Sequence, residues 1–111
     1  MHQCPVDAPI QELGGKWKLP VLFYLLQAPR RNGELRRLVP AITQKMLTQV
    51  LRELEADGFV TRTVHDQVPP KVVYSVAEEE RAGLEAIIDP LCRWGLDWAA
   101  RTHATVLALE A

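Results

Sequence analysis

The chain has 111 residues, enough for one domain with a modest core, and its 48 % hydrophobic content is that of a folded protein. The longest apolar run, "LPVLFYLL", is far shorter than the roughly 20 residues of a membrane-spanning helix. The start, "MHQCPVDAP", lacks the basic and then apolar pattern of a signal peptide. The two cysteines are widely separated, without zinc-ligand spacing. We therefore expect a soluble cytoplasmic protein with no metal or other cofactor.

The net charge of −1 hides a segregation of charge along the chain. Residues 16–76 hold ten Lys and Arg against five Asp and Glu, a net charge of +5. Residues 77–111 have a net charge of −4. A basic middle between acidic ends suits nucleic-acid binding by the middle of the chain.

Hydrophobic periodicity predicts helices in the first third of the chain. The first runs from about Asp7, acting as N-cap, to Leu13 and ends at a Gly-Gly pair. The second, over residues 16–27, is apolar nearly all round and should be deeply buried. The segment "RRNG" is predicted to be a turn or a very short strand, and a brief third helix follows over residues 34–39.

The fourth predicted helix, "TQKMLTQVLRELEAD", has clear signals at both ends. Thr43 is a good N-cap, and Gly58 stands where a C-terminal glycine belongs, so the helix should extend to about Asp57. Residues 59–64 and 71–76 are rich in β-branched and aromatic residues, which predicts a hairpin around the proline-stiffened loop "HDQVPP". A last helix begins at three consecutive glutamates and contains Pro90.

A short helix, a tight turn, a longer helix and a hairpin form the winged helix-turn-helix pattern. In that fold the second helix enters the major groove, and the hairpin, or wing, lies beside the duplex. The predicted fold class is mainly α with a small β-hairpin (α+β). We expect one domain over residues 1–111, with a DNA-binding core at about residues 16–76 and dimerisation helices at residues 5–14 and 78–105.

Several segments resemble the HxlR family of bacterial winged-helix transcriptional regulators: "CPV", "GGKW", "ELRRLVPAITQKMLTQVLRELEADGFVTR" and "VPPKVVYSV". The resemblance covers roughly residues 4–98. It implies a homodimer that binds a short palindromic operator in double-stranded DNA. Because several family members sense oxidants or electrophiles, it also implies an oxidant or a small molecule as effector.

The fourth helix carries two stripes at helical spacing. One stripe is apolar and is predicted to face the core. The other consists of Gln, Lys, Thr and Arg without a carboxylate. The acids Glu53, Glu55 and Asp57 gather at the C-terminal end of the helix, away from the end expected to enter the groove. Gln can pair with adenine edges, Lys or Arg with guanine, and the Thr methyl group with thymine. We predict base reading, with an ordinary solvated surface as the alternative. The predicted base-reading residues are Thr43, Gln44, Lys45, Thr48, Gln49 and Arg52.

Basic and polar residues on the preceding helix and the hairpin are predicted to contact phosphates or the minor groove. This set consists of Arg36, Arg37, Arg62, His65, Gln67 and Lys71. For the two arginines of the helix, the alternative is an ion pair with Glu34 or another carboxylate. For His65, the simplest alternative is an exposed loop residue.

The resemblance implies a thiol sensor at Cys4, which requires an accessible and stabilised thiolate. A place at the positive end of the first helix would lower its pKa. The alternative is a small side chain packed against a partner subunit. Cys92 lies among apolar positions of the last helix and is expected to be buried in the core or an interface.

The last helix carries apolar residues at heptad spacing, more than a terminal helix needs to cover one domain. We predict a dimer seam, with packing on the same domain as the alternative. The predicted interface consists of Ile10, Leu13, Leu84, Ile87, Leu91, Trp94 and Trp98.

The sequence is also weighed against two function classes other than a DNA-binding regulator: a protein-interaction module and an enzyme. A winged-helix protein-interaction module without DNA binding is the alternative, because fold alone does not fix function. An enzyme is not predicted, because the sequence has no phosphate-binding loop, no HExxH and no GxSxG. No membrane partner is predicted.

Overall fold

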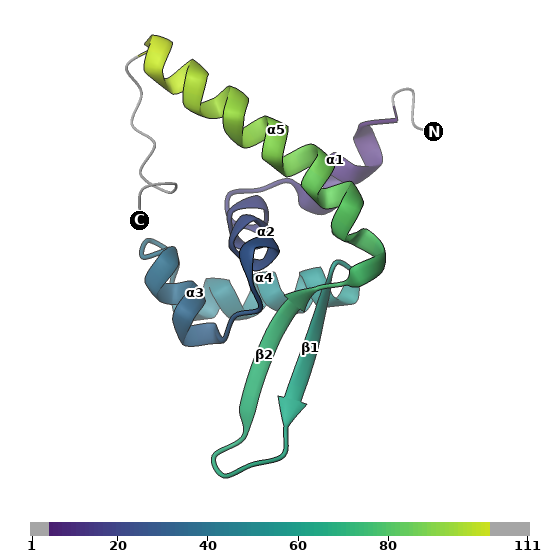
Figure 1. The fold of residues 1–111 in the computed structure, drawn as a ribbon, viewed down its shortest axis with the longest axis vertical. Helices are drawn as coiled ribbons and strands as arrows, with labels where there is room; N and C mark the ends of the chain where they lie inside the picture. The colour runs from purple at the N-terminus through teal and green to yellow at the C-terminus, as the bar shows by residue number, and fades with distance from the viewer. Residues whose placement is uncertain (1–4, 103–111) are drawn as a thin grey trace.

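The computed structural model describes residues 5–102, which form five α-helices and one antiparallel hairpin (Figure 1). In chain order, the elements are α1 (Asp7–Leu13), α2 (Lys18–Gln27), α3 (Asn32–Leu38), α4 (Gln44–Ala56), β1 (Val60–His65), β2 (Lys71–Val76) and α5 (Glu78–Thr102). The predicted α+β class is confirmed. In Figure 1, α3, α4 and the hairpin occupy the lower part of the molecule, and α5 crosses its upper part.

α2 lies at the centre of the core. Its Val21, Leu22 and Leu25 side chains have no exposed surface, as its uniformly apolar sequence predicts. α4 packs on this core through one apolar stripe only. That stripe consists of Leu47, Val50, Leu51 and Leu54. The opposite face of α4 is therefore free to carry polar residues.

Both ends of α4 are set by local sequence. The Thr43 hydroxyl accepts a hydrogen bond from the backbone N–H of Met46 at 3.1 Å, which satisfies one of the free amides at the helix start. Just after the helix, Gly58 adopts a φ of +85°, a left-handed conformation that glycine takes without steric cost. Both signals were predicted from the sequence, and the helix ends at Ala56, one residue earlier than expected.

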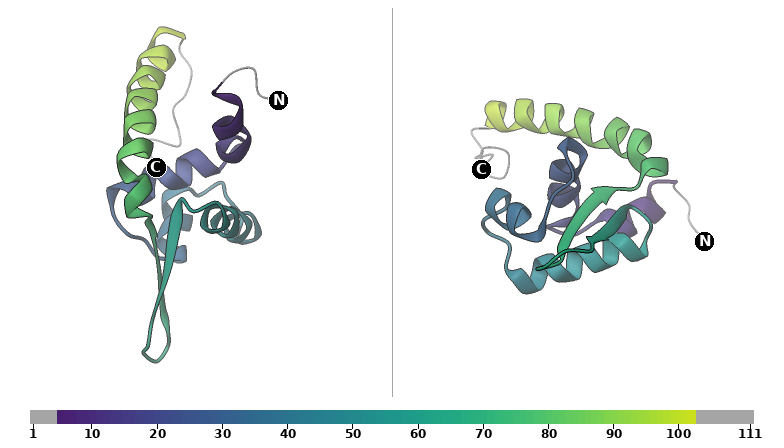
Figure 2. Two further views of the ribbon diagram at one scale, coloured as in Figure 1. Left: turned by 90° about the vertical axis from the view of Figure 1, so that its right-hand side faces the viewer. Right: turned by 60° about the horizontal axis from the view of Figure 1, so that its bottom comes forward.

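The hairpin projects from the body of the molecule (Figure 2). Its register pairs Val60 with Val76 at the base, where both side chains are buried, and His65 with Lys71 near the tip. Arg30, two residues before the start of α3, joins the free edge of β2. The backbone N–H of Arg30 donates to the carbonyl of Tyr74 at 2.9 Å, and the N–H of Tyr74 donates back at 2.8 Å. The wing is thus attached to the segment between α2 and α3.

Some predicted boundaries are wrong. Asp7 is not the N-cap of α1, because Val6 holds that position and no side chain caps the helix. α2 begins two residues later than predicted, and β1 one residue later. The segment "RRNG" was predicted to be a turn or a very short strand, and it is divided in the structure: Arg30 forms a single β-bridge with Tyr74, and α3 already begins at Asn32. A carboxylate oxygen of Glu34 accepts a hydrogen bond from the backbone N–H of Arg31 at 2.8 Å, which closes the first turn of this earlier start.

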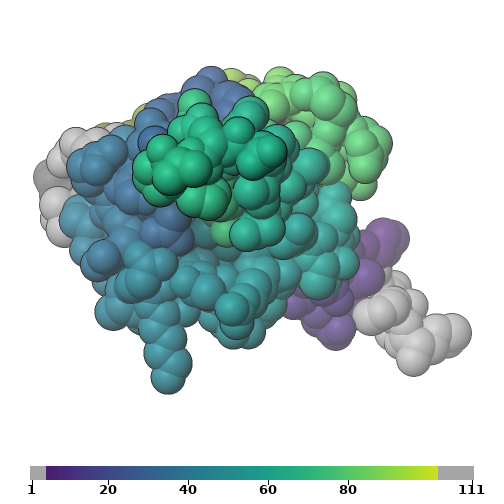
Figure 3. All heavy atoms as spheres, turned by 90° about the horizontal axis from the view of Figure 1, so that it is seen from below, coloured from purple at the N-terminus to yellow at the C-terminus, as the bar shows by residue number. Residues whose placement is uncertain are grey.

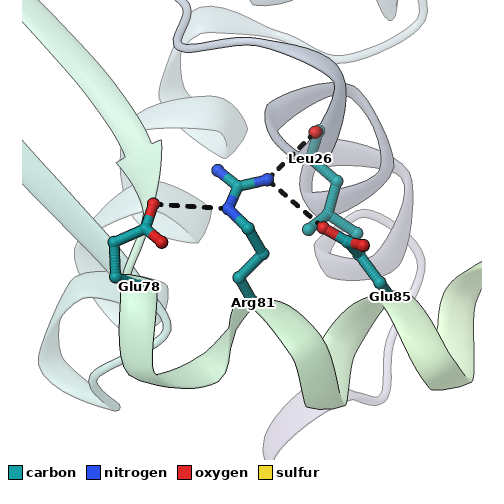
Figure 4. Close-up of polar contacts among 4 residues, drawn as sticks. All are labelled: Leu26, Glu78, Arg81 and Glu85. Atoms are coloured by element: carbon teal, nitrogen blue, oxygen red, sulfur yellow. Dashed lines mark hydrogen bonds and ion pairs between the residues drawn. The ribbon is translucent and has the colours of Figure 1, made fainter.

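α5 continues through Pro90 as one helix and is tied to α2 by Arg81 (Figure 4). One Nη of Arg81 donates to the backbone carbonyl of Leu26, in the last turn of α2, at 3.2 Å. The same guanidinium lies 3.4 Å from a carboxylate oxygen of Glu78 and 3.5 Å from one of Glu85.

No helix within residues 5–102 is long and apolar enough to span a membrane.

Candidate nucleic-acid interface

The polar face of α4 is exposed at most of the predicted base-reading positions. Gln44, Lys45, Gln49 and Arg52 are exposed, and Thr48 is half-buried. The Gln44 amide donates to the Thr48 hydroxyl at 3.1 Å, one turn along the same face. Thr43 is exposed, but its oxygen already caps the helix. Its first role is therefore structural, although its hydroxyl hydrogen and its second lone pair remain to contact a partner.

A carboxylate lies closer to this face than the sequence predicts. Gln49 donates its amide N–H to Glu53 at 3.0 Å, and the other oxygen of Glu53 lies 3.5 Å from the ammonium group of Lys18, on α2. The same ammonium group lies 3.9 Å from Asp57 and donates to the carbonyl of Glu12 at 2.8 Å. Two of the three acids at the far end of α4 are thus paired with a lysine, which offsets their repulsion of DNA.

The two strands of the hairpin present the predicted wing residues on opposite faces. Arg62 pairs with Tyr74, and Lys71 pairs with His65, which lies an odd number of residues after Arg62 on the same strand. Because side chains alternate between the faces of a strand, Arg62 and Lys71 point to opposite sides. His65 and the loop residue Gln67 are exposed. Seen from below, the hairpin projects toward the viewer next to α3 and α4 (Figure 3).

A cleft lies on each side of the wing. The cleft facing α4 has a volume of about 350 Å³ and is lined by Thr48, Arg52, Glu55, Arg62 and Tyr74. It brings a predicted base-reading arginine together with a predicted wing arginine. Glu55 also lines this cleft, so a carboxylate from the far end of α4 lies beside the two arginines.

The cleft facing α3 has a volume of about 670 Å³. Its polar lining includes Arg31, Glu34, Arg37 and Lys71. Arg37 and Lys71 were predicted from the sequence, but Arg31 was not, because "RRNG" was predicted to be a turn or a very short strand. The available signal was the pair Arg30 and Arg31, which stands directly before a helix whose third residue is Glu34. Arg36 is exposed but does not line the cleft.

The predicted dimer residues divide into two groups. Leu13 and Leu84 are only 7 % and 4 % exposed, so they belong to the core of the single chain and offer little surface to a partner. The other five keep large exposed areas. These are Ile10, Ile87, Leu91, Trp94 and Trp98. The two tryptophan rings stack, with their centroids 6.2 Å apart.

The two cysteines differ in what the structure says of them. Cys4 lies outside the described residues. Cys92 is half-buried and packs against the core from α5. Burial raises the pKa of the Cys92 thiol, and the nearby Asp89 carboxylate raises that pKa further. Cys92 is therefore less ionised at neutral pH than an ordinary thiol, which disfavours it as a nucleophile.

Comparison with known proteins identifies relatives along nearly the whole chain. The family model for the HxlR-like helix-turn-helix matches residues 12–103. The chain is 49 % identical over 108 residues to YtcD of Bacillus subtilis (strain 168), described as an uncharacterised HTH-type transcriptional regulator. The match covers 97 % of this chain and 85 % of that relative.

Solved structures of redox regulators share the fold. The redox regulator HypR in its reduced form matches with a TM-score of 0.84 and 43 % identity, over 92 % of this chain and all of that one. The reduced form of the transcriptional regulator YodB from B. subtilis matches with a TM-score of 0.72 and 32 % identity, over 84 % of this chain and 91 % of that one. YodB has also been solved after diamide treatment and with quinone bound. The chain therefore belongs to the HxlR-like helix-turn-helix family, whose members are transcriptional regulators and not enzymes.

Proposed function

We propose that this protein binds a palindromic operator in double-stranded DNA as a homodimer, with α4 in the major groove and the β1–β2 hairpin beside the duplex. The observation that carries the proposal is the exposed face of α4, where glutamine, lysine and arginine side chains stand next to a wing that carries arginine and lysine. These are the side chains that pair with base edges and phosphates. A dimer would place its two recognition helices in successive major grooves, about 34–36 Å apart.

The test of DNA reading is a selection of bound duplexes from a random pool, followed by affinity measurements on the selected operator and on a scrambled duplex. If Gln49 or Arg52 reads a base, truncating it to alanine should cost roughly 1–3 kcal/mol at the matched base pair. An equal loss on both duplexes would show that the side chain only touches phosphate. An affinity that stays flat between roughly 50 and 200 mM salt would contradict DNA binding and favour the protein-interaction module.

The proposed dimer surface is the exposed apolar face of α5, and we include the exposed Ile10 of α1 in it. Trp94 and Trp98 are 57 % and 45 % exposed in the single chain. A second copy would cover such a face in a two-fold arrangement, because each α5 offers the same apolar residues to the other. Sedimentation should show a dimer at micromolar concentration, and Trp94→Ala should shift it toward monomer. Leu96→Ala is the matched control, since Leu96 is exposed but lies off the heptad stripe.

We also propose that Cys4 senses oxidants or electrophiles and releases the operator. The resemblance to regulators solved in reduced, diamide-treated and quinone-bound forms supports this, and so does the raised pKa of the only other cysteine, Cys92. Diamide or a quinone should release the wild-type protein from its operator, and Cys4→Ser should abolish that response. Release that persists in Cys4→Ser but is lost in Cys92→Ser would assign the sensor to the other thiol.

A further inference from the structure

The cleft between α3 and the wing collects positive charge from distant parts of the chain. Arg31 lies at the start of α3, Arg37 lies on α3, and Lys71 opens β2. The cleft holds one carboxylate, that of Glu34, which already accepts the backbone N–H of Arg31 at 2.8 Å. Three cations against one acid leave a net positive cleft with a polar lining.

Gly33 is among the residues that line this cleft and contributes no side chain to it. A Cβ atom at Gly33 would lie 3.8 Å from one Nη atom of Arg37. The guanidinium group of Arg37 therefore reaches back one turn over Gly33, toward the start of α3 and into the cleft. A volume of about 670 Å³ leaves room for a phosphate group between the cations.

The two walls of the cleft are joined by backbone hydrogen bonds. Arg30, the residue before Arg31, exchanges two backbone hydrogen bonds with Tyr74 of β2, at 2.9 and 2.8 Å. This bridge holds the start of α3 against the strand that carries Lys71. Little rearrangement is then required to bring the cations around a ligand, which favours binding because less ordering is left to be done.

We propose that this cleft binds a phosphate of the DNA backbone, held by Arg31, Arg37 and Lys71 together. The inference rests on the proposed function, because a duplex with α4 in its major groove and the hairpin at its side has a strand passing the wing. A guanidinium group suits a phosphate because it offers several donors in one plane. A phosphate contact fixes the position of the protein on the duplex but carries no sequence information. Arg31 is thus a DNA contact that strengthens binding to operator and to random DNA equally.

The experiment changes the charge of the cleft in both directions. Arg31→Gln should weaken binding about tenfold or more on operator and scrambled duplexes alike, as expected when the dimer loses charged hydrogen bonds. Each phosphate contact contributes about 0.9 to the slope of log affinity against log salt, so the loss of two in a dimer should lower the slope by about 1.8. Glu34→Gln should tighten binding to both duplexes, and a misfolded variant could not mimic that gain.

Matched controls are available on α5. Arg93→Gln and Glu79→Gln make the same charge changes at exposed positions outside the cleft and should leave both affinities nearly unchanged. If Arg31→Gln behaves like Arg93→Gln while the wild type binds DNA with steep salt dependence, the cleft is not a phosphate site and the proposed function stands. A loss confined to the operator would show that Arg31 reads a base and would overturn the phosphate assignment. Salt-independent binding by the wild type would overturn the proposed function and the cleft with it.

Discussion

Replacing Glu53 by alanine should reduce discrimination between operator and random DNA, although it removes a negative charge from the helix proposed to enter the groove. Glu53 accepts a hydrogen bond from Gln49 at 3.0 Å and is itself held by Lys18 at 3.5 Å. A carboxylate can only accept hydrogen bonds, so this contact fixes the orientation of the Gln49 amide, with its N–H groups toward Glu53. Without Glu53, the glutamine would have to be ordered on binding.

The size of the effect follows from the cost of ordering one side chain. Fixing a mobile side chain at an interface costs about 0.5–1.5 kcal/mol, and a dimer places two copies of Gln49 on its operator. The predicted loss is therefore about 1–3 kcal/mol, or roughly 5- to 150-fold in operator affinity. On random DNA the removed charge acts alone and should strengthen binding slightly. The ratio of the two affinities should fall by at least the operator loss.

The assay is fluorescence anisotropy at one fixed salt concentration, with operator and scrambled duplexes. Asp57→Ala is the matched control, because Asp57 is also an acid near Lys18, at 3.9 Å, but does not contact Gln49. It should shift both affinities alike. If Glu53→Ala also shifts both alike, Gln49 is not oriented by Glu53, and the reasoning from this hydrogen bond is refuted.

Further predictions concern stability and thiol chemistry. Thr43→Ala should destabilise the protein toward urea by about 1 kcal/mol through loss of the α4 cap, and Thr43→Ser should restore most of it. Arg81→Ala should cost about 1 kcal/mol, because it leaves the Leu26 carbonyl without its donor from α5. In a Cys4→Ser background, iodoacetamide should label Cys92 more slowly at pH 7 than a free cysteine, and the rate should level off at a higher pH than for a free cysteine, because the raised pKa of Cys92 delays its ionisation. Asp89→Asn should speed that labelling.

Each of these outcomes has a contrary result. Unchanged urea midpoints in Thr43→Ala would mean that the cap contributes nothing, and a destabilised Thr43→Ser would place the effect elsewhere. Unchanged stability in Arg81→Ala would show that water replaces the guanidinium group. Fast labelling of Cys92 at pH 7, equal to that of an unfolded thiol, would contradict the raised pKa.

The elements that the sequence predicted well are those whose signals are local. The threonine before α4 and the glycine after it act through hydrogen bonds and backbone angles within a few residues, so Thr43 and Gly58 could be interpreted without a fold. The hairpin was predicted from β-branched residues and a proline loop in the same way. The helix starts were less certain, since α3 begins inside "RRNG" through the hydrogen bond from Arg31 to Glu34.

The parts of the site that sequence reasoning missed depend on contacts between distant residues. Arg31 and Lys71 line one cleft only because the start of α3 is bridged to β2. Lys18 reaches Glu53 from the first turn of α2. The burial of individual positions could not be predicted from the sequence either. Leu84 shares the heptad spacing of the exposed apolar residues on α5, yet it lies in the core. Periodicity identifies a face of a helix but not which half of that face the chain covers itself.

The register of the hairpin decides which cation serves which cleft. Side chains alternate along a strand, so a shift of one residue would move every wing side chain to the opposite face. The buried pair at the base, Val60 and Val76, opposes such a shift, because it would expose both valines. The same burial therefore places Arg62 beside Arg52 in the cleft facing α4, and Lys71 in the cleft facing α3. Two core valines thus set which side of the wing faces the proposed base-reading helix α4 and which side faces the proposed phosphate cleft.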